Sequence, residues 1–98
     1  MKKNTISITN VRLVPGDPKD AAEGLLGWAS CVVNGTVRLD GMVVRRTLDG
    51  EHALSFPARF DLAGRKHFVF SPLNDAARRE IERQVFEQLG FLREASTP

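Results

Sequence analysis

The residues of this sequence best suited to chemistry are its cations. Ten arginines are present, and a guanidinium group binds phosphate or carboxylate through a planar fork. Phosphates also bind at the start of a helix, where backbone N–H groups are free. Cations grouped in loops and at a helix start are therefore the predicted nucleic-acid-binding residues, namely Arg78, Arg79, Arg83, Arg59, Arg65 and Lys66.

A solvated charged face is an equally good interpretation of the helix arginines. Arg78 and Arg79 oppose the dipole of the helix that they begin, so they need a nearby acid or an anionic ligand. Asp75 and Glu82 are close enough in sequence to neutralise them. The net charge of +2 permits nucleic-acid binding without demanding it, because obvious binders carry a stronger basic excess.

Groups that could catalyse a reaction are sparse. His52 and His67 are the candidate bases, and neither lies in a motif of nucleophilic catalysis. Their spacing, without carboxylates at ligand distance in the sequence, argues against a shared zinc ion. Cys31 is the single cysteine and sits in an apolar run, so it is expected in the core. The sequence therefore predicts no enzyme, no catalytic residue, no metal and no cofactor.

Length and composition fit one small folded domain. The 98 residues, with 42% hydrophobic and 27% charged, predict a single domain over 1–98 with an ordered core of about 5–91. No apolar run is long enough for a membrane span, and Lys2 and Lys3 precede a strand pattern instead of a signal-peptide core. A cytoplasmic protein that does not bind membranes is the expectation.

The first third of the chain predicts strands around a loop. Alternation over residues 6–13 changes phase near Asn10, as in a strand with a β-bulge. Residues 15–24 are rich in proline, glycine and charge, which predicts a loop with at most one helical turn. Residues 25–33 are apolar or small on both alternating sides, so a strand buried on both faces is expected, with Trp28 in the core.

Turn signals divide the middle of the chain. Asn34 and Gly35 form the pair that a two-residue hairpin turn favours, because both tolerate positive φ. A return strand is expected over 36–46, in which an Asp-Gly pair predicts either a bulge or a second turn. The next strand is expected to end before Pro57. It is followed by a loop that contains Arg59 and by a short strand over 67–70.

A helix is predicted over residues 75–89. Asn74 or Asp75 can cap its start, and Gly90 can end it. Apolar residues recur every four positions along it, which predicts one buried stripe of Ala77, Ile81, Val85 and Leu89.

Together these elements predict an α+β fold. We expect a small antiparallel sheet of about four to five strands, with one C-terminal helix packed on one face. The other face then lacks a cover although its central strand is apolar. A second copy supplies that cover most simply, so a homodimer formed through the sheet is predicted.

The second half of the chain resembles the SpoVG family of bacterial septation and sporulation regulators. The family pattern there runs approximately as Met-Pro-Ser-Lys/Arg, a glycine, His-Pro-Ile-Asn, and an arginine before isoleucine. The positions that match in register are Pro57, Gly64, Pro72, Asn74, Arg78 and Ile81. Residues 10–13 and 39–44 are similar to two earlier family segments, so the resemblance spans about residues 8–90.

This resemblance implies a function. It implies a dimeric, non-enzymatic regulator of septation or sporulation-type gene expression that binds DNA, RNA or both. Arg78 and Arg79 stand where the family's basic helix residues lie, and Arg59 matches a basic position after Pro-Ser. Ser71, Phe60 and Asp61 depart from the pattern, which predicts a weaker phosphate contact in that loop. The alternative is a module that binds proteins of the septation machinery, through the sheet edge or the loop over residues 15–24, without nucleic acid.

Overall fold

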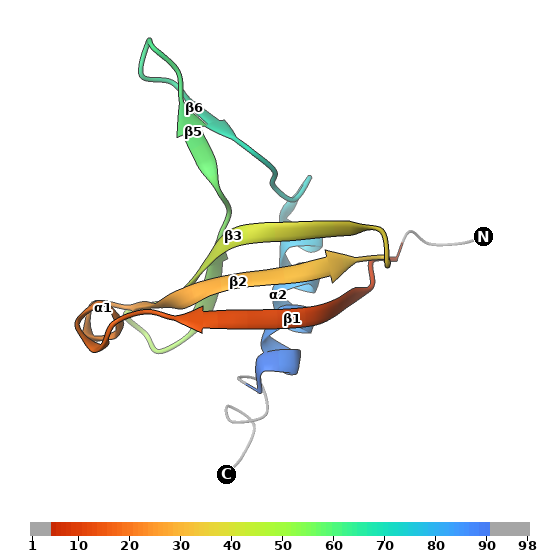
Figure 1. Ribbon diagram of the computed structural model, residues 1–98, viewed down its shortest axis with the longest axis horizontal. Helices are drawn as coiled ribbons and strands as arrows, with labels where there is room; N and C mark the ends of the chain where they lie inside the picture. Colours follow the sequence, from red (N-terminus) through yellow and green to blue (C-terminus); the bar gives the residue numbers. More distant parts are fainter. Residues whose placement is uncertain (1–4, 91–98) are drawn as a thin grey trace.

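The computed structural model describes residues 5–90 as an α+β fold (Figure 1). Four antiparallel strands form one sheet in the order in which they occur along the chain, and two further strands form a separate sheet. The elements are β1 (Ile8–Pro15), α1 (Pro18–Ala22), β2 (Leu25–Val33), β3 (Val37–Arg46), β4 (His52–Ser55), β5 (Ala58–Phe60), β6 (Lys66–Phe68) and α2 (Asp75–Leu89). Residue 91, the expected end of the core, lies outside the described residues.

The bulge and the hairpin turn predicted early in the chain are confirmed. Asn10 has a φ of 53°, and the register between β1 and β2 shifts beside it. Asn34 and Gly35 take φ values of 52° and 66°, and the N–H of Thr36 donates to the carbonyl of Val33 at 2.9 Å. Both sites therefore follow from local backbone preferences, since asparagine and glycine accept positive φ most readily.

The Asp-Gly pair within β3 forms a bulge, and β3 continues through it. Gly41 has a φ of 84°, and its N–H donates to the Asp40 carboxylate at 2.8 Å. The register against β2 shifts at this point, between Ala29 and Cys31. The extra residue bends the strand without ending its pairing.

The prediction of one sheet is corrected, because the strands after Pro57 leave it. Pro57 lacks a backbone donor, so the ladder beside β3 stops at β4. β5 and β6 pair only with each other, as a two-stranded ribbon that projects from the main sheet (Figure 1). Arg59 consequently lies in a strand instead of a loop, and the strand expected over 67–70 is Lys66–Phe68.

The predicted helix is confirmed over its whole length. The Asn74 side chain accepts a hydrogen bond from the N–H of Ala77 at 2.8 Å, so Asn74 is the N-cap. Gly90 closes the far end with a φ of 88°. The sequence left Asn74 and Asp75 open as caps, and the Asp75 carboxylate is used elsewhere.

One face of the four-stranded sheet and α2 enclose the core. Met42 and Val44 of β3 are fully buried beneath the helix residues Ile81, Val85 and Phe86. The predicted four-residue stripe is thus partly wrong: its end members are only half-buried, and Phe86 was missed. An apolar face at the helical period widens beyond a single row, because 3.6 residues complete a turn.

Within a single chain β2 is buried only on the face that packs against the helix, and its other face lacks a cover, as the prediction of one helix implies. Ala29 and Cys31 face the helix and are buried, but Trp28 on the opposite face is 41% exposed. Trp28 pairs with Val14 of β1 and Val43 of β3, and directly opposed residues point to the same side of a sheet. An apolar row of these three residues therefore runs across the outer face, which no described element covers.

Polar side chains of α2 occupy both edges of the sheet. Gln84 accepts from the N–H of Ile8 at 2.8 Å and donates to the carbonyl of Ile6 at 2.8 Å. At the other edge, Glu82 accepts from the N–H of Leu54 at 3.0 Å. The helix crosses behind the sheet from β1 to β4 (Figure 1), so it satisfies edge groups that would otherwise attract another strand.

Replacing Gln84 by leucine is expected to destabilise the fold by about 1–3 kcal/mol, because two partly buried backbone groups lose their partner. The free energy of unfolding from urea titrations measures this loss. Glu87→Gln is the control, since it removes only an exposed ion pair with Arg83 worth about 0.5 kcal/mol or less. Equal losses in the two variants would contradict the edge role of Gln84.

Candidate nucleic-acid interface

The arginines at the start of α2 are paired with acids of the same helix. The Asp75 carboxylate lies 2.8 Å from Arg78 and 2.8 Å from Arg79, through separate oxygens. Glu82 lies 3.6 Å from Arg78. The hydrogen bond from Arg78, followed by the charge of Arg79, holds the pKa of Asp75 below its ordinary value. Asp75 therefore supplies the nearby acid that two cations at a helix start require.

Arg83 is the most fully neutralised of the six candidates. Its guanidinium lies between Glu80 at 2.7 Å and Glu87 at 3.1 Å. Hydrogen bonds from Arg83 and then from Gln84 lower the pKa of Glu80 to about 2. Arg78 also has two acids, but its second, Glu82, is more distant, so a phosphate at Arg83 would face the closer competition and Arg83 is the weakest of the predicted contacts.

The register of the β5–β6 ribbon sorts its cations onto two faces. Phe60 is opposite Lys66, and Ala58 is opposite Phe68, which places these four side chains on one face. Arg59 is opposite His67, and both belong to the other face. Two of the sequence-predicted cations, Lys66 and Arg59, therefore point to opposite sides of the same ribbon.

Asp61 organises the turn of the ribbon and its second face. Its carboxylate accepts from the backbone N–H of Ala63 and of Arg65, both at 2.9 Å. It also lies 2.8 Å from Nε2 of His67 and 3.3 Å from the Arg65 guanidinium. The contact with His67, followed by the hydrogen bond from the Arg65 backbone, lowers the pKa of Asp61. Arg65 is thus partly neutralised, whereas Arg59 has no ion pair within residues 5–90.

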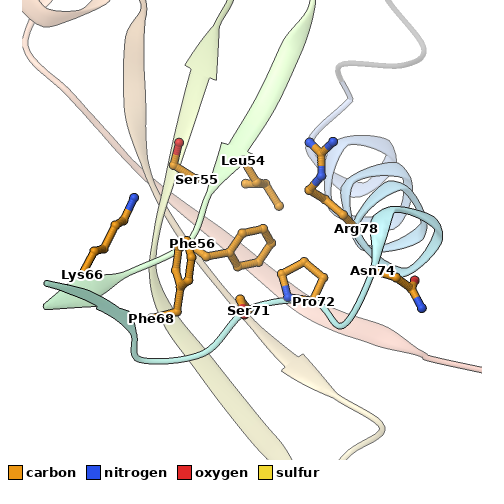
Figure 2. Close-up of a pocket in the computed structure, with 9 residues that line it drawn as sticks. All are labelled: Leu54, Ser55, Phe56, Lys66, Phe68, Ser71, Pro72, Asn74 and Arg78. Carbon is orange, nitrogen blue, oxygen red and sulfur yellow. The ribbon is translucent and has the colours of Figure 1, made fainter.

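A cavity of about 370 Å³ lies between the ribbon, the end of β4 and the start of α2. Lys66 and Arg78 stand on opposite sides of it, and the Phe56 ring lies between them (Figure 2). Phe68 and Pro72 add further apolar surface. The structure therefore brings together two of the predicted cations that are 12 positions apart in the sequence.

The lining of this cavity suits an anion with an attached planar group. Two cations line it, and no aspartate or glutamate is among its lining residues. The Lys66 ammonium lies 4.9 Å from the centre of the Phe68 ring, which is a cation–π contact between two of the lining residues. Hydroxyl groups of Ser55 and Ser71 supply neutral hydrogen-bonding atoms.

The aromatic members of this site were missed from the sequence. The sequence places Phe56 and Phe68 in predicted strands, where aromatic residues usually enter the core. A usable signal exists, because the Asp61–Gly64 turn fixes the pairing of β5 with β6. Once that register is known, alternation places Phe60, Lys66 and Phe68 on one face.

Groups suited to catalysis stay apart from this cavity. Cys31 is buried, and burial raises the pKa of its thiol, so it is a structural residue as predicted. Within residues 5–90, no three histidine, cysteine or acidic side chains gather as a metal site would require. No helix in the same range is long and apolar enough to cross a membrane.

Comparison with known proteins assigns no function to the chain. No protein-family model matches the chain, and a search of the curated proteins finds no match. The resemblance to SpoVG proteins therefore stays a prediction from the residues that carry it.

Proposed function

We propose that this chain is a non-enzymatic regulator of the SpoVG kind, which binds nucleic acid as a dimer in the cytoplasm. The observation that carries the proposal is the cavity at the start of α2, flanked by Lys66 and Arg78. Cations from two separate elements converge there: Lys66 has no ion pair within residues 5–90, and Arg78 is paired with Asp75 and Glu82, neither of which lines the cavity. Phosphate is the anion that such a pair recognises along a nucleic-acid backbone.

The other predicted cations extend this surface, and we expect them to contribute unequally to phosphate binding. Arg79 lies beside Arg78 on the exposed side of the helix start, although it shares the Asp75 carboxylate. Arg59 and Arg65 present charge from the far face and the turn of the ribbon. Arg83 contributes least, because two glutamates hold it. Phosphate binding thus centres on the cavity and falls off along the helix.

Dimerisation through the sheet is supported by the row of Val14, Trp28 and Val43 on the outer face. Val14 is 63% exposed and Trp28 is 41% exposed, so substantial apolar area meets water in a single chain. Burial of apolar surface is the main driving force of association between copies. Two copies that share this face present two sets of phosphate-binding cations to one nucleic acid.

A salt titration tests the proposal. Neutralising both cavity cations, as Lys66→Gln with Arg78→Gln, is expected to reduce the slope of log K against log salt by up to about 1.8 on a duplex or about 1.4 on a single strand, since each lost phosphate contact removes about 0.9 or about 0.7. Fluorescence anisotropy with labelled DNA and RNA measures the binding constant at each salt concentration. Arg83→Gln is the matched control and should change the slope least.

Two results of that titration would contradict the proposal. A slope unchanged by the double substitution would remove the cavity from the binding surface. No detectable binding of DNA or RNA by the unaltered protein, even at about 50 mM salt, would remove nucleic acid as the ligand. The second result would favour the alternative function, a module that binds a septation protein.

That alternative has its own structural support. A second hollow, of about 400 Å³, lies on the helix side of the sheet near the β2–β3 turn. Its lining is almost wholly apolar and includes Val37, Leu39, Phe70 and the highly exposed Leu73. An apolar hollow of this kind suits a hydrophobic side chain of another protein better than a phosphate.

A further inference from the structure

One face of the β5–β6 ribbon combines aromatic rings with a cation. Phe60 and Phe68 flank Lys66 there, because Phe60 is directly opposite Lys66 and Phe68 lies two residues further along β6. Phe60 is 69% exposed and Phe68 is 52% exposed. Large aromatic rings this exposed on a two-stranded ribbon do not serve the core, since the core lies on the main sheet under α2.

The same face is free of negative charge. Asp61 is the acid of the ribbon, and its carboxylate is on the other face, where it holds His67 and Arg65. Lys66 and Phe68 also line the cavity that Arg78 borders at the helix start. Figure 2 shows the aromatic and cationic groups from Phe68 and Lys66 to Arg78, and Phe60 adjoins them as the β5 partner of Lys66.

The spacing of the two rings suits successive bases of one strand. Diagonal neighbours in an antiparallel pair lie about 7–8 Å apart, so Phe60 and Phe68 are separated by roughly twice the 3.4 Å rise of a stacked strand, and successive bases reach both rings only when they are unstacked from one another. A base can stack on Phe60 and on the face of Phe68 that the Lys66 ammonium does not cover, and that ammonium, 4.9 Å from the centre of the Phe68 ring, is the cation nearest to the linking phosphate.

From this arrangement we infer that the ribbon face and the adjoining cavity bind single-stranded nucleic acid. Unpaired bases stack on Phe60 and Phe68, and Lys66 and Arg78 bind the phosphates between and beyond them. The inference rests on the proposed nucleic-acid-binding function and specifies its ligand. A duplex is disfavoured because its bases already stack on one another and offer no free ring face to an aromatic side chain.

Binding of two labelled probes tests the inference, one a single strand of about 15 thymidines and the other a random duplex of equal length. The unaltered protein should bind the single strand more tightly. Phe60→Ala and Phe68→Ala should each weaken single-strand binding by about 5- to 150-fold, as the loss of one stacked base does. The affinity for the duplex should change by less than about twofold.

Two further variants separate stacking from other effects. Phe68→Leu keeps an apolar side chain but removes the ring, and should weaken single-strand binding about as much as Phe68→Ala, whereas a purely apolar contact would survive this change. Leu48→Ala removes an apolar side chain that is more exposed than either phenylalanine, from the turn between β3 and β4, and should leave binding unchanged. Circular dichroism spectra identical to that of the unaltered protein show that each variant folds.

Failure of the inference is distinguishable from failure of the proposed function. Duplex binding that depends on Arg78 but not on Phe60 or Phe68 would overturn the single-strand site and leave the function standing. Binding of neither probe would overturn both. Competition by thymidine monophosphate as effective as that by the oligonucleotide would assign the site to free nucleotides instead. A change of oligomeric mass in the phenylalanine variants, with binding intact, would make the ribbon an interface between copies.

Discussion

Replacing Gly27 by alanine is expected to destabilise the fold by about 3 kcal/mol or more. A Cβ atom at this position would lie 2.4 Å from the carbonyl oxygen of Val14 and 3.0 Å from Cα of Pro15. Both contacts are with backbone, which cannot move aside without separating β1 from β2. The free energy of unfolding from urea titrations at one protein concentration measures the loss.

Gly64→Ala is the matched control for this substitution. Both glycines have a positive φ, of 157° at Gly27 and 83° at Gly64. At Gly64, however, no atom lies within 4 Å of the position that a Cβ would take. The control therefore carries only the conformational penalty of a left-handed residue, about 1–2 kcal/mol. Similar losses in the two variants would show that the backbone of β1 yields to a side chain at Gly27, contrary to the close approach.

Trp28→Glu is expected to convert the proposed dimer into monomers. The indole ring stands at the middle of the apolar row between Val14 and Val43, where a buried tryptophan typically contributes about 2–4 kcal/mol to association. A carboxylate there would also face its own copy across the twofold axis, which adds repulsion. The mass in solution, measured by sedimentation equilibrium, should fall to the 10.9 kDa of a single chain.

Leu48→Glu places the same charge on an equally hydrophobic side chain outside the row. Leu48 is fully exposed in the turn between β3 and β4, so this variant should stay dimeric. The monomeric Trp28 variant should in addition bind long nucleic acids about 10²- to 10⁴-fold more weakly, because it loses the effective concentration of a second site. An unaltered protein of monomeric mass, or a dimeric Trp28→Glu variant, would contradict the sheet interface.

The sequence predicted helices, bulges and turns well where the conformational preferences of neighbouring residues determine the structure. The helix over 75–89 was found because Asn74 and Gly90 mark its ends and apolar residues recur along it. The bulge at Asn10 and the turn at Asn34 were found because both need positive φ, which few residues accept. These features depend on neighbouring residues alone, so the sequence carries them in full.

The pairing partner of each strand and the cover of each sheet face are harder to predict from the sequence. Pro57 was recognised as the end of a strand, but its consequence, a separate ribbon of β5 and β6, depends on where the chain goes next. The apolar pattern of β2 could not tell a face covered by a helix from one left open, since both require apolar residues. Trp28 was accordingly expected in the core and lies on the outer face.

In the candidate site, too, the sequence predicts some features and only the structure shows others. Sequence grouping identified Lys66 and Arg78 as cations of interest, and the structure brings both to one cavity. Grouping alone could not say that Glu80 and Glu87 neutralise Arg83, because an exposed arginine can pair with several acids within one helical turn. Nor could it place Phe68 beside Lys66 as part of a stacking surface.

By itself, then, the sequence determined an α+β chain with a capped helix, a bulged strand, a tight hairpin turn and a set of grouped cations. Only the tertiary structure decided which of those cations converge, that Gln84 and Glu82 close the two edges of the sheet, and that one sheet face stays open. The physical reason is the distance in sequence over which the interactions act. Helix caps and turns depend on a few neighbouring residues, whereas the meeting of cations in one cavity and the covering of a sheet face depend on contacts between segments far apart in the chain.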